Sequence, residues 1–348
     1  MRALLPALSA LLLAGCETVA YYGQAAGGQL ALMGRARPLE AVRADPATGE
    51  ALKARLALAA EMRDFASREL ALPEGGAYRS YADLGRPYAL WNVVAAPEFS
   101  LAPLVSCFPV AGCVSYRGYY DREAAERHAH GLRAAGHDVV VYGVPAYSTL
   151  GWFDDPLLST FIGYAEVDLA RLMFHELAHQ QLYVKDDTAF NESFAVAVER
   201  EGLRRWLTAK GRAAELKQVR EREARVRELH AQIGAARERL AALYRSGLAS
   251  EALREKKRAE MDGLRPLLAQ FPGFAGQAPN NAVLASLATY ADLVPAFERL
   301  LADAGGDLPA FYARVSALAA LPLQERKAAL ASPPSAPSSP GPSSAPRR

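Results

Sequence analysis

The sequence predicts an α+β protein that is predominantly helical and contains a small mixed sheet. Long segments, of which 213–244 is the longest, repeat apolar residues at the three- and four-residue spacings of amphipathic helices. Three shorter segments, 88–95, 112–120 and 137–144, are rich in β-branched and aromatic residues and are bordered by turn residues, as strands are. With 51% apolar residues, a net charge of +2 and no apolar run in its body as long as a membrane span, the chain has the composition of a globular protein that binds no nucleic acid.

The first 15 residues are not expected in the mature fold. They combine Arg2 with an apolar stretch, 4–13, which is too short to span a membrane and is typical of a secretory signal peptide. The segment ends in Leu-Ala-Gly before Cys16 and so resembles the bacterial lipobox, which implies cleavage before Cys16 and attachment of lipid to it. Because Glu17 stands where an Asp would retain a lipoprotein in the inner membrane, we expect a lipid-anchored protein of the bacterial cell envelope, at the outer membrane and facing the periplasm. The alternative is an ordinary signal peptide with an incidental cysteine.

The two remaining cysteines lie close together. Cys107 and Cys113 enclose a five-residue segment whose Pro and Gly allow the chain to turn back. In an oxidising compartment we predict a disulfide between them. Two buried thiols are the alternative, and a metal pair would lack the additional cysteines that such sites usually have.

Three helices and three strands are predicted before residue 145. Asp121 can cap the third helix at its N-terminus. In chain order, the pattern indicates helices over about 22–35 and 50–70, strands over 88–95 and 112–120, a helix over 121–135, and a strand over 137–144.

The stretch Phe-His-Glu-Leu-Ala-His at 174–179 carries the chemistry of the chain. It lies within 165–183, which contains no Pro or Gly and has apolar residues at helical spacing. In a helix, His175 and His179 share one face and can offer two imidazole nitrogens to one metal ion, with Glu176 beside them. This is the HExxH signature of zinc peptidases, in which Glu176 would be the general base.

A third ligand is expected from the following helix, predicted over about 188–207. Glu192 falls in its first turns and comes within reach of the two histidines if the helices fold back on each other. Two histidines and one glutamate form the ligand set of a catalytic zinc site, which leaves a fourth position for water. We therefore predict one Zn²⁺ per chain, held by His175, His179 and Glu192, with Glu199 as the substitute for Glu192.

The segment 146–156 precedes the HExxH helix and contains Gly151 and Pro156. It fits either an edge that binds an extended peptide substrate or a plain connecting loop, and the sequence leaves both open.

The later part of the chain is predicted to be helical up to its last residues. Segments 213–244 and 250–271 form a helical hairpin joined near Gly247, whose many charges indicate solvated helix faces or, alternatively, a surface for a protein partner. The Pro- and Ser-rich residues at the C-terminal end are predicted to be disordered. We divide the chain into a signal peptide (1–15), a domain with the N-terminal helices, the sheet and the zinc-site helices (16–207), the charged hairpin (208–271), C-terminal helices packing on the catalytic domain (272–330) and the tail (331–348).

Five runs that span nearly the whole mature chain carry a resemblance to a known family: FPVAGCVSYRGY (108–119), YSTLGWFDDP (147–156), HELAHQ (175–180), DTAFNESFA (187–195) and NNAVL (280–284). They resemble bacterial exported zinc proteins known as predicted aminopeptidases. The resemblance implies a zincin-like, gluzincin-like metallopeptidase fold and removal of N-terminal residues from peptides. Larger gluzincin aminopeptidases also carry a Gly-Ala-Met-Glu-Asn-like run, which does not occur here.

The resemblance also suggests supporting residues. Gluzincins commonly stabilise the oxyanion with a Tyr or His from a later helix, for which Tyr290 is the candidate and Tyr183 the second choice. Asp187 would either orient His175 or His179 from behind or cap a helix.

The predicted function is that of a zinc-dependent aminopeptidase acting on peptide substrates. Two alternatives stay open, namely an endopeptidase acting on envelope proteins and a non-catalytic, zinc-stabilised envelope scaffold that binds a partner through its helical hairpin. The scaffold is disfavoured by Glu176, because a structural zinc site has no use for a base at that place.

Overall fold

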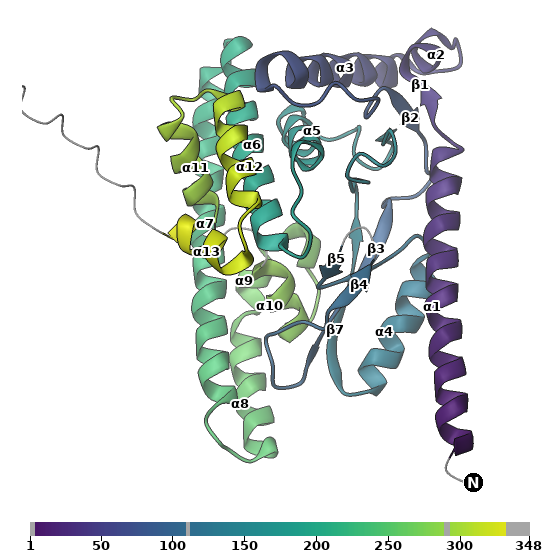
Figure 1. The fold of residues 1–348 in the computed structure, drawn as a ribbon, viewed down its shortest axis with the longest axis vertical. Helices are drawn as coiled ribbons and strands as arrows, with labels where there is room; N and C mark the ends of the chain where they lie inside the picture. The colour runs from purple at the N-terminus through teal and green to yellow at the C-terminus, as the bar shows by residue number, and fades with distance from the viewer. Residues whose placement is uncertain (1–3, 109–111, 289–292, 332–348) are drawn as a thin grey trace, which may run out of the picture. The chain divides into compact units, whose positions relative to one another are not determined.

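The computed structural model of the protein describes residues 4–108, 112–288 and 293–331 (Figure 1). The chain divides into two compact units, residues 1–294 and 295–348. The predicted predominantly helical α+β architecture with small mixed sheets is confirmed. Within the described residues, no helix combines the length and the apolar character needed to cross a membrane. Tyr290 and nearly all of the tail predicted to be disordered lie outside the described residues.

Most helices of the first unit coincide with predicted segments, although the first begins well before the predicted residue 22 and the short helix at 39–44 was not predicted. The predicted hairpin, for example, is a 32-residue helix followed by a shorter one. The helices are α1 (Leu4–Met33), α2 (Leu39–Ala44), α3 (Glu50–Leu70), α4 (Arg122–Ala134), α5 (Glu166–Gln181), α6 (Thr188–Ala209), α7 (Ala213–Tyr244), α8 (Ser250–Gly263), α9 (Arg265–Leu268), a 3-10 turn (Pro272–Phe274) and α10 (Asn281–Ala288).

The main sheet has three antiparallel strands. β3 (Leu90–Pro97) lies between β6 (Arg117–Tyr119) and β7 (His137–Val144). Because successive side chains point to opposite faces of a strand, each strand contributes to two different surfaces. One face buries side chains against α4; these are Val93, Ala95, Tyr119 and Val139, which meet Ala125 and Ala129.

The other face of this sheet is covered in part by the helical hairpin. Val94 and Val140 share one hydrophobic cluster with residues of α7, α8 and α10, including Ile233 and Leu240. The apolar stripe of the hairpin is therefore used inside the first unit. α7 and α8 run side by side (Figure 1) and are also joined by an ion pair between Arg239 and Glu260.

Residues 280–284 attach α10 to this sheet. Asn280 caps α10 by accepting the N–H of Val283, and its amide donates to the carbonyl of Val139 on β7. Asn281 donates to the carbonyl of Pro97 at the end of β3. The two neighbouring asparagines thus provide a hydrogen-bond partner for one backbone N–H at the start of α10 and for two backbone carbonyls of the strands.

Two smaller sheets complete the first unit. β2 (Ser80–Ala82) pairs antiparallel with β1 (Arg37–Pro38) and parallel with β8 (Leu157–Leu158), so this sheet is mixed. β4 (Ser106–Phe108) pairs with β5 (Gly112–Val114), and Cys107 and Cys113 form a disulfide across this pair. The backbone N–H of Cys113 donates to Asp186 at 2.6 Å, which ties the disulfide hairpin to the connection between α5 and α6.

The N-terminal helix lies against the sheet. Gln24 of α1 donates to the carbonyl of Gly118 and accepts the N–H of Tyr120, on and just after strand β6. α1 extends from the predicted helix back through Cys16 to Leu4. Removal of residues 1–15 and lipid attachment stay predictions.

α3, α5 and α6 pack closely around an aromatic core. The ring of Phe65 on α3 contacts those of Phe174 on α5 and Trp206 on α6. A Cβ atom at Gly202 of α6 would stand 2.7 Å from the Leu70 side chain and 2.8 Å from that of Phe174. The close spacing of the three helices therefore requires a residue without a side chain at this position.

The second unit consists of α11 (Val294–Asp303), α12 (Leu308–Ala319) and α13 (Leu323–Ala331). Asp307 caps α12 by accepting the N–H of Ala310. Phe311, Tyr312 and Val315 are buried. The domain boundaries predicted from the sequence stay predictions.

Candidate metal centre

α5 carries the two histidines on one side and packs an apolar side into the core. Its buried side includes Leu169, Met173 and Leu177, which anchor the helix in the core. His175 and His179 are four residues apart and therefore lie on one face, one turn apart. The helix ends directly after this pair, at Gln181.

α6 is positioned by a cap and by an amide bridge. Asp187 caps the helix, because its carboxylate accepts the N–H of Phe190 at 3.2 Å. The Asn191 side chain accepts the N–H of Val184 at 2.8 Å and donates to the Val184 carbonyl at 2.7 Å. These contacts fix the chain reversal between the two helices and bring Glu192 back toward α5.

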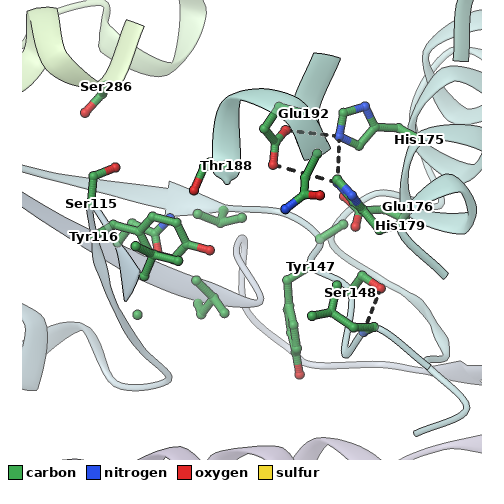
Figure 2. Close-up of a pocket in the computed structure, with 18 of the residues that line it drawn as sticks. Ser115, Tyr116, Tyr147, Ser148, His175, Glu176, His179, Thr188, Glu192 and Ser286 are labelled. Carbon is green, nitrogen blue, oxygen red and sulfur yellow. Dashed lines mark hydrogen bonds and ion pairs between the residues drawn. The ribbon is translucent and has the colours of Figure 1, made fainter. Parts of the chain in front are cut away.

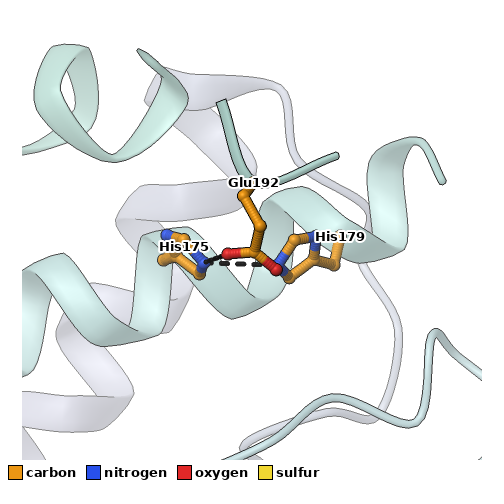
Figure 3. Close-up of side chains that lie close together, drawn as sticks. All are labelled: His175, His179 and Glu192. Atoms are coloured by element: carbon orange, nitrogen blue, oxygen red, sulfur yellow. Dashed lines mark hydrogen bonds and ion pairs between the residues drawn. The ribbon is translucent and has the colours of Figure 1, made fainter. Parts of the chain in front are cut away.

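Glu192 reaches both histidines (Figure 3). Its Oε2 lies 3.4 Å from His175 Nε2, and its Oε1 lies 3.7 Å from His179 Nε2. The two Nε2 atoms are 3.2 Å apart. The three side chains predicted as ligands are thus brought together, with one ligand atom of each within 4.8 Å of the others.

The spacing of these atoms suits a tetrahedral metal ion. Two nitrogen or oxygen ligands bound to one zinc ion at about 2.0–2.1 Å lie about 3.3 Å from each other. The observed separations of 3.2–3.7 Å are close to that value. A set of two imidazoles and one carboxylate is also the set that catalytic zinc sites use. The cluster of His175, His179 and Glu192 could therefore hold a metal ion.

Glu199 holds His175 from the opposite side of the ring. Its Oε2 lies 3.1 Å from His175 Nδ1, and its Oε1 accepts a bond from Arg171 Nε at 2.6 Å. With Nδ1–H donated to Glu199, the Nε2 lone pair of His175 is directed at the cluster. The alternative in which Glu199 is the third ligand is therefore wrong, because its carboxylate meets the other ring nitrogen.

Two roles were predicted for Asp187, and the structure shows the one in which it caps a helix. At the His175 ring, the position expected for Asp187 is taken by Glu199. His179 Nδ1 is buried and has no hydrogen-bond partner in the described part of the chain.

The electrostatics of the cluster are dominated by burial and by the carboxylates. Burial opposes charge on His175, but hydrogen bonds to Glu192 and Glu199 outweigh it and raise the pKa of the imidazole well above its usual value. Burial and the neighbouring His175 lower the pKa of His179 to about 4. Burial raises the pKa of Glu176 to about 7, which suits a group that accepts and returns a proton near neutral pH.

A pocket of about 310 Å³ opens beside the cluster (Figure 2). His175, His179, Glu176 and Glu192 form one wall. The main sheet forms the other wall with the face that points away from α4. The lining residues from the sheet and its flanks are Leu90, Asn92, Val94, Val114, Ser115, Tyr116, Gly118, Tyr142 and Val144.

The segment 146–156 is a loop, and part of it reaches the pocket. Ala146, Tyr147, Ser148 and Leu150 are lining residues. The loop is closed by Asp155, whose carboxylate accepts the N–H of Thr149 at 2.8 Å. The segment connects β7 to β8 and contacts the pocket, and its contact with a peptide substrate stays a prediction.

Tyr116 is a pocket residue that the sequence analysis missed. It lies between β5 and β6 and stands across the pocket from the cluster (Figure 2). Desolvation and the charge of Glu192 raise its pKa. In the sequence, only its position just after the predicted disulfide could have indicated that Tyr116 reaches the pocket. Tyr183, the second oxyanion candidate, also lines the pocket.

A family model described as putative aminopeptidase matches residues 20–330. No curated protein and no solved structure matches the chain.

Proposed function

The chain belongs to the putative aminopeptidase family, and from this premise we propose that it is a zinc-dependent peptidase. One observation carries the proposal. The ligand atoms of His175, His179 and Glu192 converge at one end of a pocket that also contains Glu176. A closed structural site would have a fourth protein ligand, whereas this cluster faces open space and a buried carboxyl group.

The mechanism follows from the side chains that line the pocket. When bound, a zinc ion supplies Lewis acidity, which lowers the pKa of the attacking water toward neutrality and polarises the scissile carbonyl. Glu176 accepts the proton that the water loses and returns it to the leaving nitrogen.

Tyr116 and Tyr183 are the proposed donors to the oxygen that becomes negative. Both line the pocket. Desolvation, and after it the charge of Glu192, raises the pKa of each hydroxyl. A raised pKa keeps a phenol protonated and able to donate a hydrogen bond to a developing oxyanion.

Glu199 and Arg171 act through His175. The buried ion pair between them fixes the carboxylate that accepts His175 Nδ1–H, so the imidazole keeps one tautomer and one orientation. We propose both as positioning residues.

One observation favours endopeptidase action as a second candidate. Of the described residues that line the pocket, only Glu176 and Glu192 carry a carboxylate, and both already have roles in the cluster. An aminopeptidase must desolvate the terminal ammonium of its substrate, which is costly without an opposite charge. A peptide bound in mid-chain makes no such demand.

We also propose that the protein is anchored by lipid on Cys16 at the outer membrane, facing the periplasm. The apolar segment 4–13 and the Leu-Ala-Gly-Cys sequence support this proposal. Mass spectrometry of the chain purified from membranes would show diacylglycerol on an N-terminal Cys16, and Cys16→Ser would release the protein into the soluble fraction. A wild-type chain that is soluble and not acylated would contradict the anchor.

Two substrate classes test the peptidase proposal. The zinc-loaded mature protein is offered amino-acid amides with a free amine and internally quenched peptides with a blocked N-terminus. Glu176→Gln serves as the inactive control, and its zinc content is measured in parallel. Cleavage of the amides supports an aminopeptidase, and cleavage of only the quenched peptides supports an endopeptidase. Zinc retained without cleavage of either class would overturn the proposed function.

A further inference from the structure

The sheet wall of the pocket contains one polar rung. On β3, the residues that line the pocket are Leu90, Asn92 and Val94, so Asn92 stands between two apolar side chains. In the sheet register, Asn92 pairs with Gly118 of β6 on one side and with Tyr142 of β7 on the other. We call Gly118, Asn92 and Tyr142 the polar rung.

Asn92 has an unused hydrogen-bond acceptor. The residue is 7% exposed, and its Oδ1 has no hydrogen-bond partner among the described residues. The Tyr142 hydroxyl makes side-chain hydrogen bonds with Asn92 and Ser286. Because Oδ1 is unpartnered, the amide nitrogen of Asn92 makes the bond to Tyr142. A buried acceptor without a partner is destabilising, and its presence beside a pocket points to a donor supplied by a ligand.

Gly118 places no side chain beside this acceptor. A Cβ atom at position 118 would stand 3.4 Å from Asn92 Oδ1 and 3.7 Å from Leu90 Cδ1. The φ angle of Gly118 lies outside the left-handed region, so the backbone itself does not require glycine there. What glycine provides at this position is room beside the oxygen.

We propose that the polar rung is the specificity subsite of the pocket and receives an uncharged substrate side chain that ends in a hydrogen-bond donor, such as the phenol of tyrosine. The assignment rests on the proposed peptidase function. Leu90, Val94 and Val144 contact the hydrocarbon part of the side chain, and Asn92 Oδ1 accepts its terminal hydrogen. A lysine or arginine side chain is disfavoured, because the described residues of the rung and its neighbours carry no charge to pair with it.

Paired peptides test this subsite. Internally quenched peptides that differ only in Tyr or Phe, placed on either side of the scissile bond, are compared by kcat/KM with the zinc-loaded protein. Their dissociation constants are measured separately with zinc-loaded Glu176→Gln protein, so that binding is read without turnover. We expect the Tyr peptide to be favoured by about tenfold in both measurements, since a site built for a donor rejects the analogue that lacks it.

Two variants remove the acceptor in different ways. Asn92→Leu deletes it, and Gly118→Ala covers it without altering Asn92. Each variant should reduce the Tyr-to-Phe ratio to about one. Gln277→Ala is the control, because Gln277 donates to the Val141 carbonyl on β7 and does not line the pocket. It should keep the full ratio. Thermal unfolding verifies that each variant is folded, and Gly118→Ala alone is decisive if Asn92→Leu does not fold.

The outcomes separate this inference from the peptidase proposal. Equal binding and cleavage of Tyr and Phe peptides by the wild type would overturn the subsite, as would a ratio unchanged in Gly118→Ala. Selective binding of the Tyr peptide without cleavage by the wild type would support the subsite and overturn only the peptidase function.

Discussion

The two walls of the pocket are built on different principles. The wall from α5 and α6 carries the ionisable groups of the pocket, which contact one another: Glu192 meets His175 and His179, and Glu199 meets His175. The described residues of the sheet wall carry no charged side chain, and one buried acceptor, Asn92 Oδ1, lies between Leu90 and Val94 with no partner in the described structure. The proposed metal ligands and the proposed base therefore lie on the helical wall, whereas the sheet wall provides the proposed specificity subsite and one proposed oxyanion donor, Tyr116.

The first test of this difference between the walls removes a proposed metal ligand from the helical wall. Glu192→Ala should weaken zinc binding on the order of 10³-fold, because one of three protein ligands is lost. Zinc affinity is measured by competition with a chromogenic chelator. Glu201→Gln is the matched control, since Glu201 lies on the same helix and pairs only with Arg204 and Arg205 in the described ion pairs. Unchanged affinity in Glu192→Ala would remove Glu192 from the ligand set.

Removing the proposed base should separate catalysis from zinc binding. Glu176→Gln keeps the size and polarity of the side chain but cannot accept a proton. We expect kcat to fall on the order of 10³-fold with zinc content unchanged. A variant that retains a tenth or more of the wild-type rate would show that another group takes the proton.

The loop between the walls provides a test of stability. Burial raises the pKa of Asp155 from 3.8 to about 6 in the folded chain. A carboxyl group with a raised folded pKa holds its proton longer when folded, so the chain loses stability as the pH rises from about 4 to 6, by about 3 kcal/mol in all. Asp155→Asn keeps an oxygen for the Thr149 N–H and removes this dependence.

Urea unfolding at pH 4 and pH 7.5 measures the effect. Relative to the wild type, Asp155→Asn should gain stability at pH 7.5 and little or none at pH 4. An equal difference in the free energy of unfolding between Asp155→Asn and the wild type at both pH values would show that folding does not raise the pKa of Asp155.

The smallest expected effect on the helical wall concerns the residue behind His175. Glu199→Gln retains an acceptor for Nδ1–H but loses the negative charge that faces the imidazole and Arg171. We expect zinc affinity to fall about tenfold. The competition assay used for Glu192→Ala applies, again with Glu201→Gln as control. An affinity within twofold of the wild type would mean that the charge of Glu199 does not support the site.

The two walls also differ in how far the sequence predicts them. His175 and His179 are placed by helical periodicity alone, and Glu192 follows once the next helix is recognised, because both signals are local. The side of the His175 ring that Glu199 meets depends on how two helices rotate against each other, which spacing does not determine. The sequence therefore predicted that His175, His179 and Glu192 come together, but not that Glu199 contacts the other nitrogen of the His175 ring.

The sheet wall could not be predicted because its residues meet only through strand pairing. Asn92, Gly118 and Tyr142 come from three strands, and their register is set by the packing of the whole sheet. Tyr116 enters the pocket from a short connection after the disulfide hairpin. No sequence pattern marks Asn92 or Tyr116 as a pocket residue. A single polar residue within a predicted strand, such as Asn92, would ordinarily be expected to face solvent.

Gly202 shows how strictly a position that does not line the pocket can be constrained. Even the methyl group of alanine would meet Leu70 and Phe174, so the place in the core where α3, α5 and α6 meet admits a single amino acid. In a library covering every substitution, we expect this glycine to tolerate less exchange than several residues of the pocket itself. Substitutions in the strands can therefore change the proposed substrate preference during evolution. The helices that carry the two histidines and Glu192 keep a fixed separation.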